Sequence, residues 1–169
     1  VDVVAYGCTS GTIEIGEERI KSEIHKSKVD ALITTPITAA IKAFKLSNFK
    51  KIAVLTPYPK EVNVKVYKYL IKHGFDIKSF SSFNLNYDSE IAKVTSDSLV
   101  QTISSLDLTD IDCLFVSCTA LKILDLIEDL EENLKTNIIS SNQVLIWDSL
   151  RLSKTNNKID GFGKLFKLH

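Results

Sequence analysis

The sequence predicts an α/β fold in which short parallel strands alternate with helices. Short runs of apolar and β-branched residues alternate with longer segments whose apolar residues recur every three to four positions. Such alternation is typical of parallel sheets whose faces are covered by helices. One order of elements also occurs twice, because a strand, a Cys-Thr turn, a helix, a strand and a helix follow each other in both halves of the chain.

Six runs have the composition and length of strands. Residues 1–6 are nearly all apolar, as expected for a strand covered on both faces of a parallel sheet. The other five runs are residues 31–34, 51–56, 75–82, 113–117 and 137–140, and each ends close to residues typical of turns. Residues 83–88 then form a polar loop.

The segments between these strands have helical apolar spacing. The first predicted helix is capped by Thr12, and the others cover residues 36–46, 60–73, 89–106, 120–134 and 143–152. Pro36 suits a first helical turn, Gly74 ends the helix before it, and a break is expected near Thr95. Residues 120–134 have the most regular apolar spacing of all.

An internal repeat predicts the domain organisation. Cys8 and Cys118 each follow a strand, and Asp2 and Asp112 precede them by the same six positions. The second half has two further strands before its cysteine, so an equivalent of roughly 60 residues is expected before Val1. We therefore expect residues 1–49 to be the remainder of an N-terminal lobe, with the helix and tail 142–169 packing back on it. Residues 50–141 form the predicted C-terminal lobe.

The composition argues against several classes of function. Lys+Arg and Asp+Glu number 21 each, and only Arg19 and Arg151 are arginines, so a nucleic-acid interface is not expected. No apolar run approaches the ~20 residues of a membrane span, and no signal peptide opens the chain. The three cysteines lack the close pairing of zinc sites, and His25, His73 and His169 have no ligand spacing. We expect a cytoplasmic protein with free thiols, surface histidines and no metal.

Three residues that follow strands are candidates for a functional site. Cys8, Tyr58 and Cys118 all lie at the carboxyl ends of strands, where ligands bind in such folds, so we expect them to share one crevice. Both cysteines precede predicted helices, whose amide groups and positive dipole end favour a thiolate and bind anions. Cys113, inside its strand, is expected to be a core residue. A tyrosine-phosphatase loop is not predicted, because Glu14 stands where that loop needs an arginine.

Four motifs along the chain resemble a known enzyme family. They are AYGCTSGT at residues 5–12, LTPYPKEVN at 55–63, VSCTAL at 116–121 and SSNQVLIWDSLR at 140–151. Together they resemble the maleate cis-trans isomerase branch of the aspartate/glutamate racemase superfamily, whose neighbours include arylmalonate decarboxylases and ectoine-utilisation proteins. The resemblance implies two pseudo-symmetric lobes with parallel four-stranded sheets, of which the first lacks its first two strands here.

The resemblance also implies roles for particular residues. It makes Cys8 the nucleophile and Cys118 the opposing thiol that donates or accepts a proton. Thr9, Ser10 and Tyr58 match the positions that hold a substrate carboxylate.

Two further positions follow from the same resemblance. The turn at Thr119 is expected to add a backbone donor, and Asn86 matches a substrate-binding asparagine. Another asparagine, expected at the tip of the family's first strand, has no matching position in this sequence.

The resemblance implies a cofactor-independent isomerase that converts maleate to fumarate through a cysteine adduct. Its expected ligand is a small dicarboxylate, and it is expected to form a homodimer or a larger homo-oligomer, with no nucleic-acid or membrane partner. A two-cysteine racemase acting on aspartate or glutamate is an alternative, in which one thiolate removes the α-proton and the other thiol returns one. A non-catalytic protein that binds small acids is a second alternative, favoured by the absent asparagine. An arylmalonate-type decarboxylase is less favoured, since those enzymes keep one active-site cysteine.

Overall fold

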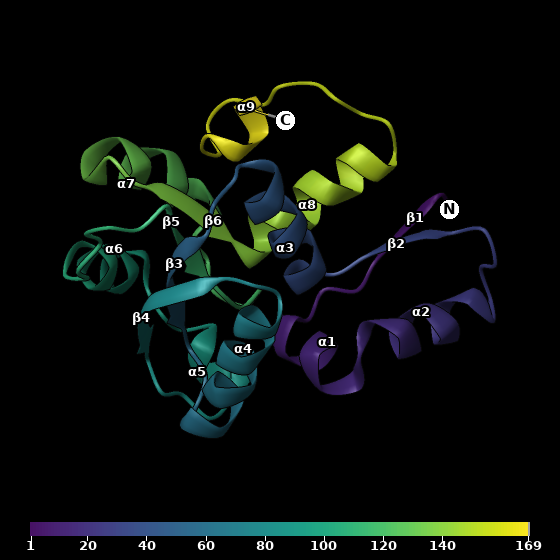
Figure 1. Cartoon of the computed structure of the whole chain (residues 1–169), viewed down its shortest axis with the longest axis horizontal. Coiled ribbons are helices and arrows are strands. Elements are labelled where there is room, and N and C mark those ends of the chain that lie inside the picture. The colour runs from purple at the N-terminus through teal and green to yellow at the C-terminus, as the bar shows by residue number, and fades with distance from the viewer. Residues whose placement is uncertain (169) are drawn as a thin grey trace.

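Two parallel sheets form the framework of the molecule (Figure 1). The computed structural model describes residues 1–168. The larger sheet has the strand order β4-β3-β5-β6, with β3 (Lys51–Thr56), β4 (Asp76–Ser82), β5 (Cys113–Val116) and β6 (Asn137–Ser140) all parallel. The smaller sheet pairs β1 (Val3–Ala5) with β2 (Leu32–Thr34), also in parallel. The predicted α/β fold with parallel sheets is confirmed.

Helices follow the strands in regular order. They are α1 (Thr9–Ile15), α2 (Glu17–His25), α3 (Pro36–Leu46), α4 (Lys60–Lys72), α5 (Asp88–Ile91), α6 (Ser96–Ser104), the 3-10 helix η1 (Leu124–Leu126), α7 (Ile127–Leu134), α8 (Ser141–Leu152) and α9 (Leu165–Leu168). Several predicted boundaries are confirmed, since Pro36 begins α3 and α4 ends just before Gly74. Thr95 caps α6 and separates it from α5, which confirms the predicted break.

The larger sheet carries the main hydrophobic core. Strand β3 pairs on both sides, with Val54 opposite Phe80 of β4 and Phe115 of β5. All four residues of β5 are fully buried, which is why this strand reads as a continuous apolar run. Phe44 of α3 packs edge-on against Phe75 and Phe115, with ring centroids 5.2 and 5.4 Å apart.

Helices α3 and α8 lie side by side in the centre of the molecule (Figure 1). Each follows the last strand of its half and begins with a capping box, formed by Thr35 and Thr38 at α3 and by Ser140 and Gln143 at α8. Helix α8 also contacts β1 and β2. The matching caps agree with an internal repeat, whereas the proposed lobe boundaries remain a prediction.

Two predicted helices differ from those in the structure. The first helix begins at Thr9 with Cys8 as its cap, and Thr12 instead donates its hydroxyl to the Cys8 carbonyl at 2.6 Å. Gly16, with φ of 91°, then divides the predicted helix into α1 and α2. The predicted helix 120–134 is wrong over its first half, where turns and η1 precede α7.

The physical reason for the second error is a competing set of hydrogen bonds. The Asn142 amide donates to the carbonyls of Thr119 and Leu121 at 3.0 and 3.3 Å, and the Ile123 N–H donates to Leu121 at 3.1 Å instead of to Thr119, where a helix would direct it. Leu121 and Ile123 are nevertheless buried, and this burial produces the apolar spacing. In the first half of residues 120–134, the regular apolar spacing therefore reflects burial of side chains and not a helical backbone.

Strand β1 is also less buried than its composition predicts. Val3 and Val4 are half-buried and Ala5 is exposed, as is Leu32 of β2. The prediction of a strand covered on both faces is wrong for the described structure, because β1 pairs only with β2 and α8 covers it from one side.

Other expectations concern isolated residues. His25 is exposed and His73 half-buried, each with a ring nitrogen at a backbone carbonyl, while His169 lies outside the described residues. All three cysteines are free thiols, as predicted, and Cys113 is fully buried in β5. Across residues 1–168, no helix is both long and apolar enough to cross a membrane.

Candidate functional site

Cys8 lies in a short turn between β1 and α1 and caps that helix. Its Sγ accepts a hydrogen bond from the Gly11 backbone N–H at 3.2 Å, and its own N–H donates to the Tyr6 carbonyl at 3.0 Å. A side chain at Gly11 would crowd the thiol, since a Cβ there would lie 2.8 Å from the Cys8 Sγ and 2.9 Å from the Tyr6 hydroxyl. The turn thus holds a partly exposed thiol among backbone donors.

Cys118 occupies a comparable place after β5, in a conformation that side chains rarely adopt. Its φ is 105°, and such strain in a residue other than glycine is common at functional sites. The Sγ accepts a hydrogen bond from the Ala120 N–H at 3.4 Å. Asn142 fixes the turn, because its side-chain amide donates to the carbonyls of Thr119 and Leu121.

The ionisation of Cys118 differs from the sequence-based expectation. Burial raises the pKa of this thiol, and the charges of Asp88 and Cys8 raise it further. Hydrogen bonds from the Ala120 N–H and from Tyr58 act in the opposite direction but are smaller. The expectation that the dipole of a following helix stabilises a Cys118 thiolate is wrong, because the next α-helix, α7, begins only at Ile127.

Hydrogen bonds join the two cysteine turns directly. The hydroxyls of Thr9 and Ser141 lie 2.9 Å apart, and the Ser141 Oγ accepts the Cys118 backbone N–H at 3.0 Å. From the other turn, the Thr119 hydroxyl donates to the Gly7 carbonyl at 2.8 Å. Thr9 and Ser141 are almost fully buried, so this bridge is shielded from water.

Tyr58 is held beside Cys118 by its own backbone. Its carbonyl accepts hydrogen bonds from the Asn63 side-chain amide at 2.7 Å and from the Ser82 hydroxyl at 2.6 Å. Burial is the main cause that raises the pKa of the Tyr58 hydroxyl well above its ordinary value. The same hydroxyl interacts with the Cys118 thiol and lies near Thr9. Cys8, Thr9, Tyr58 and Cys118 are therefore brought together by the fold.

The remaining predicted site residues lie further out. The Ser10 hydroxyl is 3.9 Å from the Cys8 Sγ, and Ser10 also lines a cavity of about 300 Å³ between α1 and α4. Asn86 lies in the exposed loop before α5, where its backbone N–H donates to Glu90 at 3.2 Å. The roles assigned to these residues stay predictions.

Sequence reasoning missed several residues that organise the site. Ser141 bridges the two cysteine turns, Asn142 fixes the second turn, and Asn63 fixes Tyr58. A signal for the first two existed in the sequence, since residues 140–143 place four polar side chains at the end of a buried strand. For Asn63 the signal was its place at the end of the LTPYPKEVN motif, residues 55–63.

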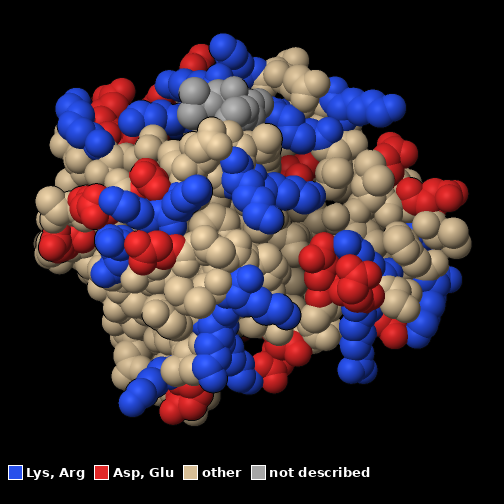
Figure 2. Space-filling view, in the orientation of Figure 1, with Lys and Arg blue, Asp and Glu red and all other residues tan. Residues whose placement is uncertain are grey.

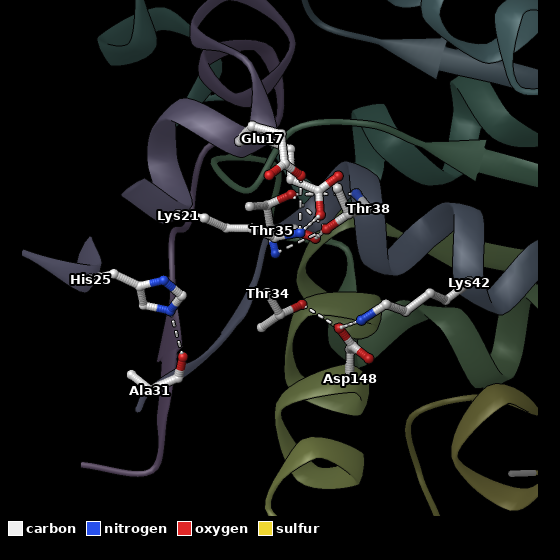
Figure 3. A network of polar contacts seen from close by, with 10 residues as sticks. Glu17, Lys21, His25, Ala31, Thr34, Thr35, Thr38, Lys42 and Asp148 are labelled. Atoms are coloured by element: carbon white, nitrogen blue, oxygen red, sulfur yellow. Dashed lines mark hydrogen bonds and ion pairs between the residues drawn. The ribbon is translucent and has the colours of Figure 1, made fainter. Parts of the chain in front are cut away.

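A buried polar network supports the strand that carries the Cys8 turn (Figure 3). Asp148 of α8 is 3% exposed and accepts the Thr34 hydroxyl at 2.5 Å and the Lys42 ammonium at 2.7 Å. The Thr34 carbonyl in turn accepts the Tyr6 N–H at 3.0 Å. Asp148 thus anchors β2, and through β2 the segment that precedes Cys8.

Comparison with curated proteins returns maleate isomerases and an arylmalonate decarboxylase. Maleate isomerase from Nocardia farcinica is 22% identical over 174 residues, which cover 98% of this chain and 69% of that protein. Arylmalonate decarboxylase from Bordetella bronchiseptica is 26% identical over 136 residues, with 79% and 57% covered.

Solved structures show the same fold. Nocardia farcinica maleate cis-trans isomerase bound to TRIS superposes with a TM-score of 0.90 at 22% identity, covering 98% of this chain and 70% of that one. A crystal structure of arylmalonate decarboxylase superposes with a TM-score of 0.85 at 23% identity, covering 100% and 76%. These matches show the aspartate/glutamate racemase-like fold that the sequence motifs imply.

The family model for arylmalonate decarboxylase matches residues 17–166, which is most of the chain. This match includes the Tyr58 loop, the Cys118 turn and both sheets except β1. The chain therefore belongs to the arylmalonate decarboxylase family.

Proposed function

We propose that this chain isomerises maleate to fumarate, without a cofactor, through a covalent adduct with Cys8. The observation that carries the proposal is the pair of thiols, Cys8 and Cys118, on two turns tied together by Ser141 and Thr119. Each thiol follows a strand of a different sheet, and Cys8 lies close enough to raise the pKa of Cys118.

The proposed reaction begins with addition of the Cys8 thiolate to one alkene carbon of maleate. A C–S bond forms, the C=C π bond opens, and its electron pair moves onto the neighbouring carbon and its carboxylate. The remaining single bond can rotate. When the electron pair re-forms the double bond, the C–S bond breaks, and fumarate and the thiolate are released. No oxidant, reductant or net proton is consumed.

Cys118 would act as an acid and then as a base. Because burial raises the pKa of its thiol, Cys118 stays protonated at neutral pH. It could give this proton to the carbon that received the electron pair, which leaves a succinyl group on Cys8, and take it back before elimination. A thiol with a depressed pKa would be a weaker candidate for this donor role.

The polar groups around the thiols could hold the two carboxylates. Addition increases the negative charge on one carboxylate, and hydroxyl and amide donors can receive that charge. Tyr58 keeps its proton because its pKa is raised, so it remains a donor at neutral pH. We assign the same task to Thr9, Ser10 and the turn at Thr119, and we assign the outer carboxylate to Asn86.

Named relatives support the proposal. Maleate isomerases from Nocardia farcinica and Alcaligenes faecalis match 98% of this chain at 22% and 17% identity. A cysteine-to-serine mutant of the Nocardia farcinica enzyme has a covalently bound succinylcysteine intermediate. An adduct of this kind is what addition of one thiol and protonation by the other would produce.

A two-cysteine racemase is the second candidate, and the same pair of thiols favours it. One thiolate would remove the α-proton of aspartate or glutamate, and the opposite thiol would return a proton to the other face. A protein that binds small acids without turning them over would use the same hydroxyl groups. Decarboxylation of an arylmalonate is less favoured, because this site contains two cysteines.

Proton NMR in deuterated water separates these candidates. We expect the purified protein to convert maleate to fumarate, and the Cys8→Ser variant to lose at least about a thousandfold in turnover. Cys113→Ala is the matched control, because this cysteine is fully buried in β5 and should leave turnover unchanged.

Three outcomes would contradict the proposal. Deuterium entering the α-carbon of aspartate or glutamate, without maleate turnover, would support the racemase. Saturable maleate binding without any turnover would support the non-catalytic alternative. Near-normal turnover by Cys8→Ser would remove Cys8 as the nucleophile.

We also propose a cytoplasmic location and a homodimeric or larger assembly. Light scattering on the purified protein tests the assembly, and a monomeric mass at micromolar concentration would contradict it.

A further inference from the structure

A groove lies between helix α4 and strand β4, which is the edge strand of the larger sheet. The two elements are in contact and lie next to each other in Figure 1. The groove has a volume of about 390 Å³. Its lining includes Lys60, Val64, Tyr67 and Lys68 of α4 and Phe80 and Ser82 of β4.

The floor of the groove is apolar and open to solvent. Val64 is 42% exposed and Tyr67 is 44% exposed, so both side chains are accessible to a ligand. The Tyr67 ring lies edge-on to the half-buried ring of Phe80, with the ring centroids 6.2 Å apart. A flat aromatic body can add a further ring to this pair and cover the valine beside it.

Two lysines lie at the two ends of this apolar floor. Lys60, Val64 and Lys68 follow each other at intervals of four residues, so they form one row along α4 with the valine between two cations. At 1.5 Å per residue, the two lysines are about 12 Å apart along the helix axis. Both are exposed, and across residues 1–168 no carboxylate pairs with either of them. Figure 2 shows Lys and Arg side chains gathered in the lower part of the view, where α4 lies in Figure 1.

Two polar residues of the lining already have partners within the protein. The Asn63 side chain donates to the Tyr58 carbonyl at 2.7 Å and accepts the Thr56 hydroxyl at 2.5 Å. The Ser82 hydroxyl donates to the same Tyr58 carbonyl at 2.6 Å and accepts the Asn84 N–H at 3.0 Å. The lysines are therefore the charged donors that the groove offers to a ligand, and its wall is formed by the residues that hold Tyr58.

The order of cation, apolar floor and cation selects one class of ligand. A monocarboxylate with an apolar body would leave one ammonium group unpaired, and a short diacid such as succinate would leave the apolar floor in water. A second copy of this chain is disfavoured, because a symmetric contact would bring the same lysines of both copies together. A dicarboxylate with a flat apolar body fits both the charges and the floor.

We propose that this groove is a second ligand site, separate from the thiols, that binds a small dicarboxylate with an aromatic body. One carboxylate pairs with Lys60 and the other with Lys68, while the aromatic body packs on Val64 and Tyr67. Binding at this groove is independent of the proposed reaction.

Naphthalene-2,6-dicarboxylate is the probe, because it has one carboxylate at each end of a flat ring system. The experiment titrates the purified protein with this probe at low ionic strength, where surface charge pairs are strongest, and follows the methyl signals of Val64 by NMR. We expect a saturable shift of these signals. The monocarboxylate 2-naphthoate should bind about two- to fivefold more weakly, which corresponds to the loss of one exposed ion pair.

Variants of the lining test each contact. Lys60→Gln and Lys68→Gln should each lower the affinity for the probe to about that of 2-naphthoate, since either change leaves one cation. Lys45→Gln is the matched control, because it removes an exposed lysine from another helix, α3. Tyr67→Ala should weaken binding by about three- to tenfold, whereas Tyr67→Phe keeps the ring and should bind the probe normally.

Absence of a saturable shift up to about 10 mM probe would overturn the proposal. Equal affinities for the probe and for 2-naphthoate would overturn the pairing with two lysines, and with it the proposed class of ligand. Equal loss of affinity in Lys45→Gln and in the two groove variants, or unchanged affinity in Tyr67→Ala, would show that the probe does not bind in this groove.

Discussion

Gly11→Ala is expected to damage the Cys8 turn while leaving the fold intact. The added Cβ would lie 2.8 Å from the Cys8 Sγ and 2.9 Å from the Tyr6 hydroxyl. Ordinary contacts are about 3.5–4.0 Å, so the thiol or α1 must move by about 1 Å. The same shift weakens the 3.2 Å hydrogen bond from the residue 11 N–H to the Cys8 Sγ.

The two effects of Gly11→Ala on stability oppose each other. Alanine favours the helix by about 0.5–1 kcal/mol over glycine, whereas overpacking costs about 1–3 kcal/mol. The net loss is about 1 kcal/mol, which lowers the melting temperature by about 2–4 °C for a chain of this size. Turnover is far more sensitive, because a misplacement of about 1 Å can cost about a hundredfold in rate.

The assay measures maleate turnover by NMR together with the melting temperature of each variant. Gly7→Ala is the matched control, since a Cβ at position 7 would meet only the Leu145 side chain, at 3.9 Å. We expect near-normal turnover for that control. The reasoning is refuted if folded Gly11→Ala retains turnover within about threefold of the wild type, or if Gly7→Ala is equally impaired.

Two further predictions concern stability. Burial raises the pKa of Cys113 well above 9.0, so above that pH the unfolded chain loses a proton that the folded chain keeps. The free energy of unfolding should therefore fall as pH rises above about 9, by at most about 1.4 kcal/mol per pH unit per group. Cys113→Ala should reduce this slope against pH when it is measured by urea melts. An unchanged slope would contradict the prediction. Lys42→Met leaves Asp148, 3% exposed, without its cation. Since Lys42 is itself partly exposed, the cost should be about 1–3 kcal/mol. The equivalent change Lys26→Met, in the exposed Glu23–Lys26 pair at the end of α2, should cost under about 0.5 kcal/mol. Equal melting temperatures for Lys42→Met and Lys26→Met would refute the buried-pair argument.

Local chemistry made most elements predictable. Strand β3 and helix α3 were predicted at their observed bounds, because continuous apolar runs and an N-terminal proline act through neighbouring residues only. The parallel sheets followed from the same alternation. The helix predicted over residues 120–134 was wrong in its first half, where Asn142, far along the chain, donates to the carbonyls of Thr119 and Leu121 and supports a turn.

The candidate site was also predictable from the sequence only in part. Sequence motifs identified Cys8, Cys118 and Tyr58 as candidates, and the fold brings them together at one end of the two sheets. The ionisation of Cys118 was not predictable, because desolvation depends on what packs around a thiol and not on its neighbours in sequence.

The sequence by itself determined the order of strands and helices, the family and the residue types of the site, since propensity, caps and motifs are properties of short segments. Only the tertiary structure decided that Ser141 and Thr119 join the two cysteine turns, that Asp148 is buried against Thr34, and that Arg151 Nε and Nη2 are buried. These contacts join residues more than 20 positions apart or depend on burial, and both arise from the packing of α3 and α8 between the sheets.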